Sequence, residues 1–135
     1  MRQIMLVDDS ADQIELMELA FATQGIAHPV VTFSSGEAAV AALQSGAVTP
    51  RLILLDVNMP GLDGPATAAR IRRLPEGRFV PIVMMSTSDQ PDDVRRAREA
   101  GADGYVQKPV GQRTWSDLLA SVAGYWLGAD LGFRA

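Results

Sequence analysis

The sequence contains no cysteine and only one histidine among its 135 residues. The lack of cysteine excludes disulfides, thiolate zinc sites and cysteine nucleophiles, and one histidine is too few for a His-rich metal site. No apolar run reaches the roughly 18 residues that a membrane-spanning helix needs. The first ten residues also lack the long apolar stretch and small-residue cleavage site of a signal peptide. We therefore expect a cytoplasmic protein that does not bind membranes.

Basic residues are outnumbered: 12 Lys and Arg stand against 16 Asp and Glu, for a net charge of −4. Broad attraction to nucleic acid would need a basic surface, so no nucleic-acid partner is expected. Apolar residues make up 47% of the sequence, which is enough to build one hydrophobic core in a chain of this length. The sequence thus predicts a single domain.

Short apolar runs alternate with amphipathic stretches along the whole chain. Five runs predict strands, at residues 3–7, 29–33, 51–55, 80–85 and 104–107. The stretches between and after them predict helices at about residues 10–24, 38–43, 65–73, 92–100 and 112–127. Strands that are apolar without polar alternation are typical of a parallel sheet that is covered on both faces. With right-handed crossovers, this pattern predicts an α/β fold with a doubly wound, five-stranded parallel sheet.

The residues that follow the predicted strands are chemically distinctive. Asp8 and Asp9 follow the first strand, Asp56 the third, Ser86 the fourth and Lys108 the fifth. In open α/β sheets, sites form beyond the carboxyl ends of the strands, so we expect these side chains to meet. Three clustered carboxylates favour a neutralising cation, and oxygen ligands without His or Cys favour Mg²⁺. A carboxylate beside a hydroxyl, an ammonium and Mg²⁺ is suited to attack an incoming phosphoryl group.

Each of these residues has an ordinary explanation when it is taken alone. An Asp pair before a helix is commonly a cap, a strand-terminal Asp can form a turn, and a loop Ser or Lys is commonly solvated. Their joint placement at the ends of four strands is harder to attribute to capping. The combination therefore favours a functional site.

Four stretches together are highly specific for one family. The chain resembles the receiver domain of two-component response regulators over about residues 2–127. The matching stretches are IMLVDDS (4–10), LLDVNMPGLDG (54–64), IVMMSTSD (82–89) and AGADGYVQKP (100–109). The resemblance implies a (βα)5, flavodoxin-like fold with strand order 2-1-3-4-5. It also implies a receiver domain over residues 1–127, followed by a short tail at 128–135 without an output domain.

The resemblance also implies a role for each matching site residue. Asp56 would be the phosphoacceptor, and it would attack the phosphohistidine of a partner kinase to form an acyl phosphate. Asp8 and Asp9 would hold Mg²⁺ together with a carboxylate oxygen of Asp56 and the backbone carbonyl of Asn58.

Three further positions match the residues that contact the phosphoryl group or report its presence. Ser86 stands at the switch-hydroxyl position, Lys108 at that of the phosphate-contacting lysine, and Tyr105 at the switch-aromatic position. The peptide bond between Lys108 and Pro109 is typically cis in this family.

The resemblance therefore predicts a single-domain response regulator, which is not an enzyme beyond its own phosphorylation and autodephosphorylation. The partner would be a sensor histidine kinase, such as one of the phytochrome type, or a histidine phosphotransfer protein. Tyr125 and Trp126 suggest a self-association surface near the end of the last helix, and the fourth helix, fifth strand and last helix offer another.

A Mg²⁺-dependent phosphotransferase or phosphatase of the haloacid dehalogenase type is the alternative, since it also uses an Asp nucleophile on a doubly wound sheet. That family needs a second Asp two residues after the nucleophile on the first strand. Here Ser10 stands two residues after Asp8, and the chain offers no cap domain.

Overall fold

Five parallel strands form one sheet in the order β2-β1-β3-β4-β5, so the predicted α/β fold and strand order are confirmed. The computed structural model describes residues 2–109 and 114–127. The strands are β1 (Gln3–Val7), β2 (Val30–Phe33), β3 (Pro50–Asp56), β4 (Ile82–Ser86) and β5 (Gly104–Gln107). The helices are α1 (Ala11–Thr23), α2 (Gly36–Gln44), α3 (Gly64–Arg73), α4 (Pro91–Glu99) and α5 (Trp115–Leu127), with a 3-10 turn, η1 (Pro75–Gly77), after α3.

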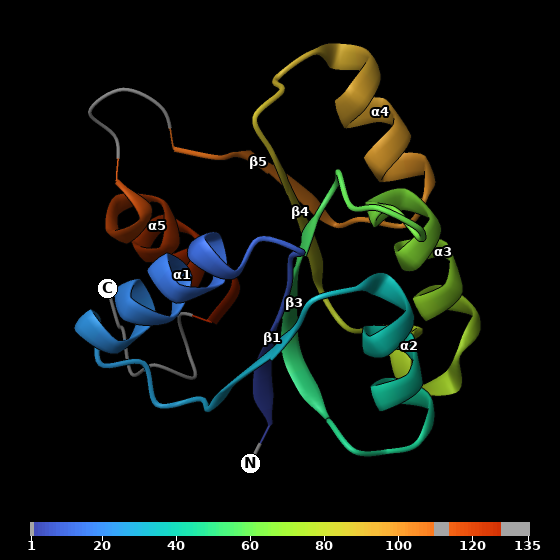
Figure 1. Cartoon of the computed structure of the whole chain (residues 1–135), viewed down its shortest axis with the longest axis horizontal. Helices are drawn as coiled ribbons and strands as arrows, with labels where there is room; N and C mark the ends of the chain where they lie inside the picture. Colours follow the sequence, from blue (N-terminus) through green and yellow to red (C-terminus); the bar gives the residue numbers. More distant parts are fainter. Residues whose placement is uncertain (1, 110–113, 128–135) are drawn as a thin grey trace.

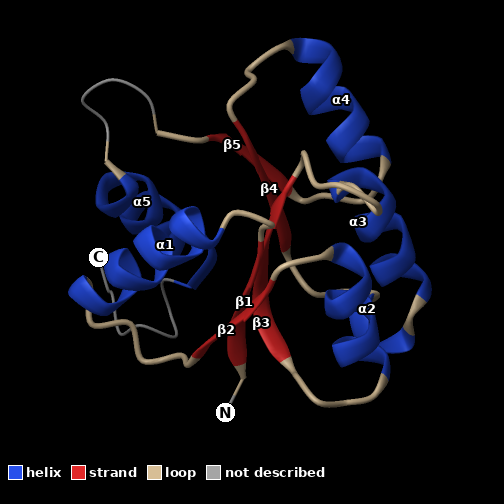
Figure 2. Cartoon of the chain, viewed as in Figure 1, coloured by secondary structure: helices blue, strands red, loops and turns tan. Residues whose placement is uncertain are grey.

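Helices cover both faces of the sheet (Figures 1 and 2). α1 and α5 lie on one face, and α2, α3 and α4 lie on the other. Successive strand residues alternate between the two layers, as the pleat requires. In β1, Ile4 and Leu6 join the core beneath α1 and α5, whereas Met5 and Val7 join the core on the opposite face. The continuous apolar runs of the sequence follow from this arrangement, because both sides of each central strand are buried.

The element boundaries differ from the predicted ones in a few places. β4 begins two residues later than expected and extends through Ser86, which places that hydroxyl in the last position of the strand. η1 was not predicted, because three residues of 3-10 turn give no periodic signal. The predicted start of the last helix at residue 112 and the predicted tail at 128–135 lie outside the described residues.

The cap of α1 is also only partly as expected. The pattern from Ser10 to Gln13 predicts a capping box, in which each side chain binds the backbone N–H of the other residue. Ser10 Oγ does accept from Gln13 N at 3.3 Å. Ser10 N, however, donates to Asp8 Oδ1 at 2.9 Å, so the side chain of Gln13 is left for another contact.

No peptide bond among the described residues is cis. The expectation of a cis bond between Lys108 and Pro109 is therefore wrong in this structure, where that bond has the ordinary trans form.

No helix in the described ranges is long and apolar enough to cross a membrane.

Candidate phosphorylation and metal site

The carboxyl ends of β1, β3, β4 and β5 bring the predicted site residues to one edge of the sheet. Asp56 and Ser86 are the last residues of β3 and β4, and Asp8 and Lys108 directly follow β1 and β5. Parallel strands point the same way, so residues far apart in the sequence meet there. All four side chains are buried, although polar residues of these types are usually exposed. A pocket opens above them, lined by Asp8, Asp9, Ser10, Gln13, Asp56, Asn58, Thr87 and Lys108.

Lys108 lies at the centre of the charged contacts. Its Nζ atom is 2.9 Å from Asp56 Oδ1 and 3.3 Å from Asp8 Oδ2, and it also donates to Gln13 Oε1. An ammonium group has three N–H donors, so these three acceptors account for all of them. Lys108 is only 7% exposed, so its charge is stabilised mainly by these protein atoms and not by solvent.

The ionisation of Asp56 reflects opposing influences. Burial raises the pKa of the Asp56 carboxyl above its ordinary value of 3.8, while the hydrogen bond from Lys108 acts in the opposite direction. The negative charge of Asp8 raises the pKa further, and a backbone hydrogen bond from Asn58 lowers it. Burial outweighs the stabilising contacts, so the anionic form of Asp56 is less favoured than that of a solvated aspartate.

The three aspartates have the geometry of a site for a hard cation. One carboxylate oxygen from each of Asp8, Asp9 and Asp56 lies within 4.8 Å of the others. Asp8 and Asp56 are buried and Asp9 is exposed, so an ion could reach them from solvent through the pocket. Asn58 lines the same pocket. Oxygen ligands of this kind fit Mg²⁺, which keeps several waters and binds through one or two carboxylates.

The backbone after Asp56 is held close to α3 by a glycine. Gly64 N donates to Val57 O at 2.9 Å. A Cβ atom at Gly64 would lie 2.5 Å from the Asp56 carbonyl oxygen, which is too close for any other residue without movement of the backbone. The Asp-Gly pair at 63–64 therefore combines two functions, since Asp63 caps α3 by accepting from Ala66 N at 2.9 Å.

Ser86 and Tyr105 are linked through one loop residue, Ser88. Ser86 Oγ accepts from Ser88 N at 3.1 Å, and Tyr105 Oη donates to Ser88 O at 2.7 Å. Ser88 Oγ in turn donates to Asp93 Oδ2 in the first turn of α4 and accepts from Gln90 N at 3.2 Å. The resemblance to receiver domains predicts roles for Ser86 and Tyr105 but none for Ser88, although Ser88 connects both of them to α4.

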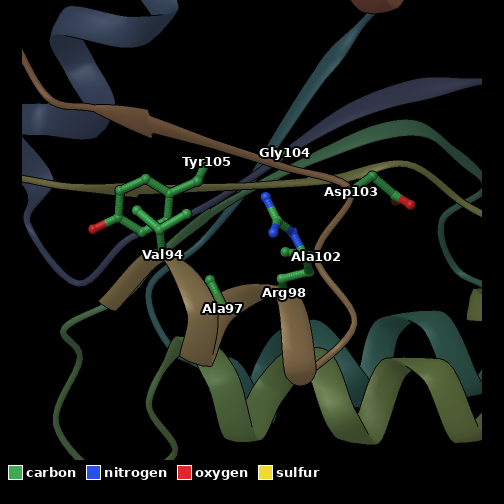
Figure 3. A pocket seen from close by; sticks show the side chains of 7 residues that line it. All are labelled: Val94, Ala97, Arg98, Ala102, Asp103, Gly104 and Tyr105. Atoms are coloured by element: carbon green, nitrogen blue, oxygen red, sulfur yellow. The ribbon is translucent and has the colours of Figure 1, made fainter. Parts of the chain in front are cut away.

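Tyr105 forms one wall of a small pocket between α4 and β5 (Figure 3). The pocket is lined by Val94, Ala97, Arg98, Ala102, Asp103, Gly104 and Tyr105. The tyrosine is half-buried and packs against the core beneath α2, α3 and α4, with its hydroxyl engaged by the loop after β4. This structure therefore already holds Tyr105 toward that loop.

Comparison with known proteins identifies the family. Residues 4–120 match the model of the response regulator receiver domain. The chain belongs to this family. The receiver domain is 31% identical over 129 residues to the response regulator Rcp1 of Synechocystis, an alignment that covers 92% of this chain and 88% of Rcp1.

Solved structures agree with this assignment. The receiver domain superposes on the phosphorylated cyanobacterial phytochrome response regulator RcpA with a TM-score of 0.85 and 31% identity, covering 95% of each chain. It also matches the receiver domain of a sensor histidine kinase from Pseudomonas aeruginosa, described with a magnesium ion in its active-site cleft, at a TM-score of 0.79 and 26% identity, covering 94% and 98% of the two chains. The matches support a response regulator of two-component signalling and not the haloacid dehalogenase alternative.

Proposed function

We propose that this receiver domain accepts one phosphoryl group on Asp56, with Mg²⁺ held by the carboxylates of Asp8, Asp9 and Asp56 and by the backbone carbonyl of Asn58. The observation that carries the proposal is the buried contact between Asp56 and Lys108 at 2.9 Å, inside a pocket that is otherwise lined by acidic and polar groups. When bound, Mg²⁺ would supply positive charge that offsets the negative charge of the pocket and of the phosphoryl oxygens.

The group that donates the phosphoryl is a phosphohistidine of a sensor kinase or of a histidine phosphotransfer protein. An oxygen of Asp56 forms the new bond to phosphorus while the bond from phosphorus to the imidazole nitrogen breaks, and the imidazole leaves. Lys108 carries the positive charge that meets the phosphoryl oxygens. The chemistry of the receiver domain is limited to this transfer and to the later loss of the phosphoryl group by hydrolysis.

The face of α1 beside the pocket is suited to a protein partner. Leu16 and Leu19 are 48% and 64% exposed, and they share a groove with Pro109 and Trp115. Exposed leucines that gather around a groove are typical of an interface. We propose that the histidine-bearing partner docks here in the cytoplasm, and the similarity to RcpA favours a phytochrome-type kinase.

The opposite end of the molecule offers a second surface. Tyr125 is 80% exposed, and its ring lies 4.9 Å from that of Trp126 in an edge-to-face arrangement. Trp126 packs against Gly104 of β5, where an added Cβ would come within 2.9 Å of the indole ring. We propose that this end of α5, together with α4 and β5, forms the surface that changes on phosphorylation and through which two copies associate.

Replacing Asp9, the exposed one of the three carboxylates, should weaken metal binding without destabilising the fold. We expect Asp9→Ala to weaken Mg²⁺ binding at least about tenfold, in line with the cost of removing even outer-shell partners of a metal. Its melting temperature in metal-free buffer should stay the same or rise, because a like charge next to Asp8 and Asp56 is lost. Titration calorimetry with Mg²⁺ and thermal denaturation measure the two effects.

The matched control for this test is Asp12→Ala, which removes the same charge from an exposed position on α1. It should leave Mg²⁺ affinity close to that of the unmodified protein. Equal weakening by both variants would show that Asp9 acts only through the general acidity of the surface, and the proposed ligand set would be wrong.

The switch should depend on the hydroxyl of Ser86. A phosphoryl group adds about −1.5 to −2 charge. Shifting the ratio of active to inactive conformation from 1:99 to 99:1 takes about 5.5 kcal/mol. A charge-assisted hydrogen bond supplies about 1.5–3 kcal/mol, so Lys108 and Ser86 are both needed. We expect Ser86→Ala to accept phosphate but to lose most of the response of α4 to beryllofluoride, a mimic of the phosphoryl group.

Hydrogen exchange of residues 91–99 with and without beryllofluoride measures this response. Ser45→Ala is the control, because Ser45 Oγ makes the same type of local contact, accepting from Ala47 N at 3.3 Å, outside the site. A full response from Ser86→Ala would mean that the signal reaches α4 by a route other than the link from Ser86 to Ser88.

A further inference from the structure

Gln13 contacts the charged centre of the site but has no role in the function proposed above. It lies in the first turn of α1 and lines the pocket with the three aspartates. Its Oε1 atom accepts a hydrogen bond from Lys108 Nζ. Lysine can only donate, so the amide must present its oxygen to the ammonium. The side chain is available for this contact because Asp8, and not Gln13, accepts the hydrogen bond from Ser10 N.

The three acceptors around Lys108 differ in what Mg²⁺ would do to them. Asp8 and Asp56 are both proposed metal ligands, and a bound cation competes with the ammonium for their oxygens. It also repels the ammonium directly. Among the described contacts of Lys108 Nζ, Gln13 Oε1 is the acceptor that is neutral and outside the proposed ligand set.

We propose that Gln13 is a positioning residue that keeps the Lys108 ammonium in the pocket when Mg²⁺ binds. Without Gln13, the flexible four-carbon stem of Lys108 would let the ammonium move away from the metal toward solvent. With it, the ammonium remains ordered and available to the oxygens of an incoming phosphoryl group. This inference rests on the proposed function, because that function assigns Asp8 and Asp56 to the metal.

The sequence itself provides a direct probe of this contact. Lys108 is the single lysine among the 135 residues. In ¹⁵N-labelled protein, the side-chain ammonium resonance of lysine therefore comes from one residue and needs no assignment by mutagenesis. An ordered, hydrogen-bonded ammonium exchanges its protons slowly and is visible, whereas a solvated one exchanges too fast to be observed.

The test compares Gln13→Met, which keeps the length of the side chain but removes the acceptor, with the unmodified protein. In metal-free buffer we expect the ammonium signal from both, because Asp8 and Asp56 hold Lys108. In saturating Mg²⁺ we expect the signal to persist in the unmodified protein and to disappear in Gln13→Met. Mg²⁺ affinity should change less than about twofold, while beryllofluoride affinity in Mg²⁺ should fall about tenfold, since the lost bond is to a charged group.

Two further variants test the interpretation. Gln13→Glu retains an acceptor oxygen at the same distance from the backbone and should keep the signal in Mg²⁺. Gln44→Met, at an exposed position of α2, makes the same chemical change away from the pocket and should behave as the unmodified protein.

Two results would overturn the proposal. One is a persistent ammonium signal in Gln13→Met with Mg²⁺ bound, because Lys108 would then be held without Gln13. The other is loss of the signal with and without metal, which would show a general structural role. Failure of the unmodified protein to bind beryllofluoride would instead contradict the proposed function, and the ammonium signal would still report on Gln13.

Discussion

Asp56→Asn should eliminate phosphorylation by acetyl phosphate while leaving the rest of the pocket in place. The amide has nearly the shape of the carboxyl group but is not a nucleophile at neutral pH. The unmodified protein should gain the mass of one phosphoryl group in the presence of Mg²⁺, and hydroxylamine should remove it, as expected of an acyl phosphate. Intact mass spectrometry measures both results.

The control for this experiment is Asp89→Asn, which alters an exposed carboxylate in the loop after β4. It should be phosphorylated as fully as the unmodified protein. Labelling of Asp56→Asn to the same extent would assign the acceptor to another residue, and the central role of Asp56 would have to be abandoned.

Lys108→Met should destabilise the protein in metal-free buffer at neutral pH. The replacement leaves Asp8 and Asp56, which are 1% and 3% exposed, without their cationic partner. Removing one member of a buried ion pair costs on the order of 3 kcal/mol, because the remaining charge is neither solvated nor paired. Mg²⁺ should restore much of the lost stability by replacing the missing positive charge. Denaturant unfolding with and without Mg²⁺ measures the change.

The loss of stability in Lys108→Met should grow as the pH rises. Burial raises the pKa of Asp56 above 3.8 in the folded protein, and the hydrogen bond from Lys108, which acts against this, is absent in Lys108→Met. A carboxyl group whose folded pKa is raised favours folding below its unfolded pKa. That advantage is lost as the pH rises through the folded pKa. The free energy of unfolding of Lys108→Met should therefore fall relative to the unmodified protein as the pH rises from about 4 toward neutrality.

The double variant Lys108→Met with Asp56→Asn provides the control. The double variant keeps the methionine at position 108 but removes the charge at position 56. It should therefore be more stable than Lys108→Met at neutral pH and should lose most of the pH dependence. A loss of stability that is the same at every pH, and that the second substitution does not reduce, would mean that Lys108 acts through its packing alone.

The fold could be predicted because its local signals agree with its long-range structure. β1 and β3 are largely apolar runs, each followed by or ending in an aspartate, and such runs are typical of strands that are buried on both faces of a covered parallel sheet. Once the strands are parallel, the residues that follow them must share an edge. The proximity of Asp8, Asp56 and Lys108 could thus be expected from their order along the chain.

Side-chain contacts that cross the fold could not be predicted in the same way. The spacing of Ser10 and Gln13 predicts a local capping box, but Gln13 instead binds Lys108, 95 residues away. This contact depends on which acceptors the buried ammonium reaches, and no local pattern contains that information. No local pattern predicts the role of Ser88 for a similar reason, since its four hydrogen bonds involve its backbone N–H, its carbonyl and its hydroxyl in one folded loop.

The role of Asp56 is tested most directly by locating the phosphoryl group in the unmodified protein. After reaction with acetyl phosphate and Mg²⁺, borohydride reduces an aspartyl phosphate to homoserine, which tandem mass spectrometry can place in the sequence. We expect homoserine at position 56 and at no other aspartate. Homoserine at Asp8 or Asp9, or a phosphoryl group that survives on Ser86, would contradict it.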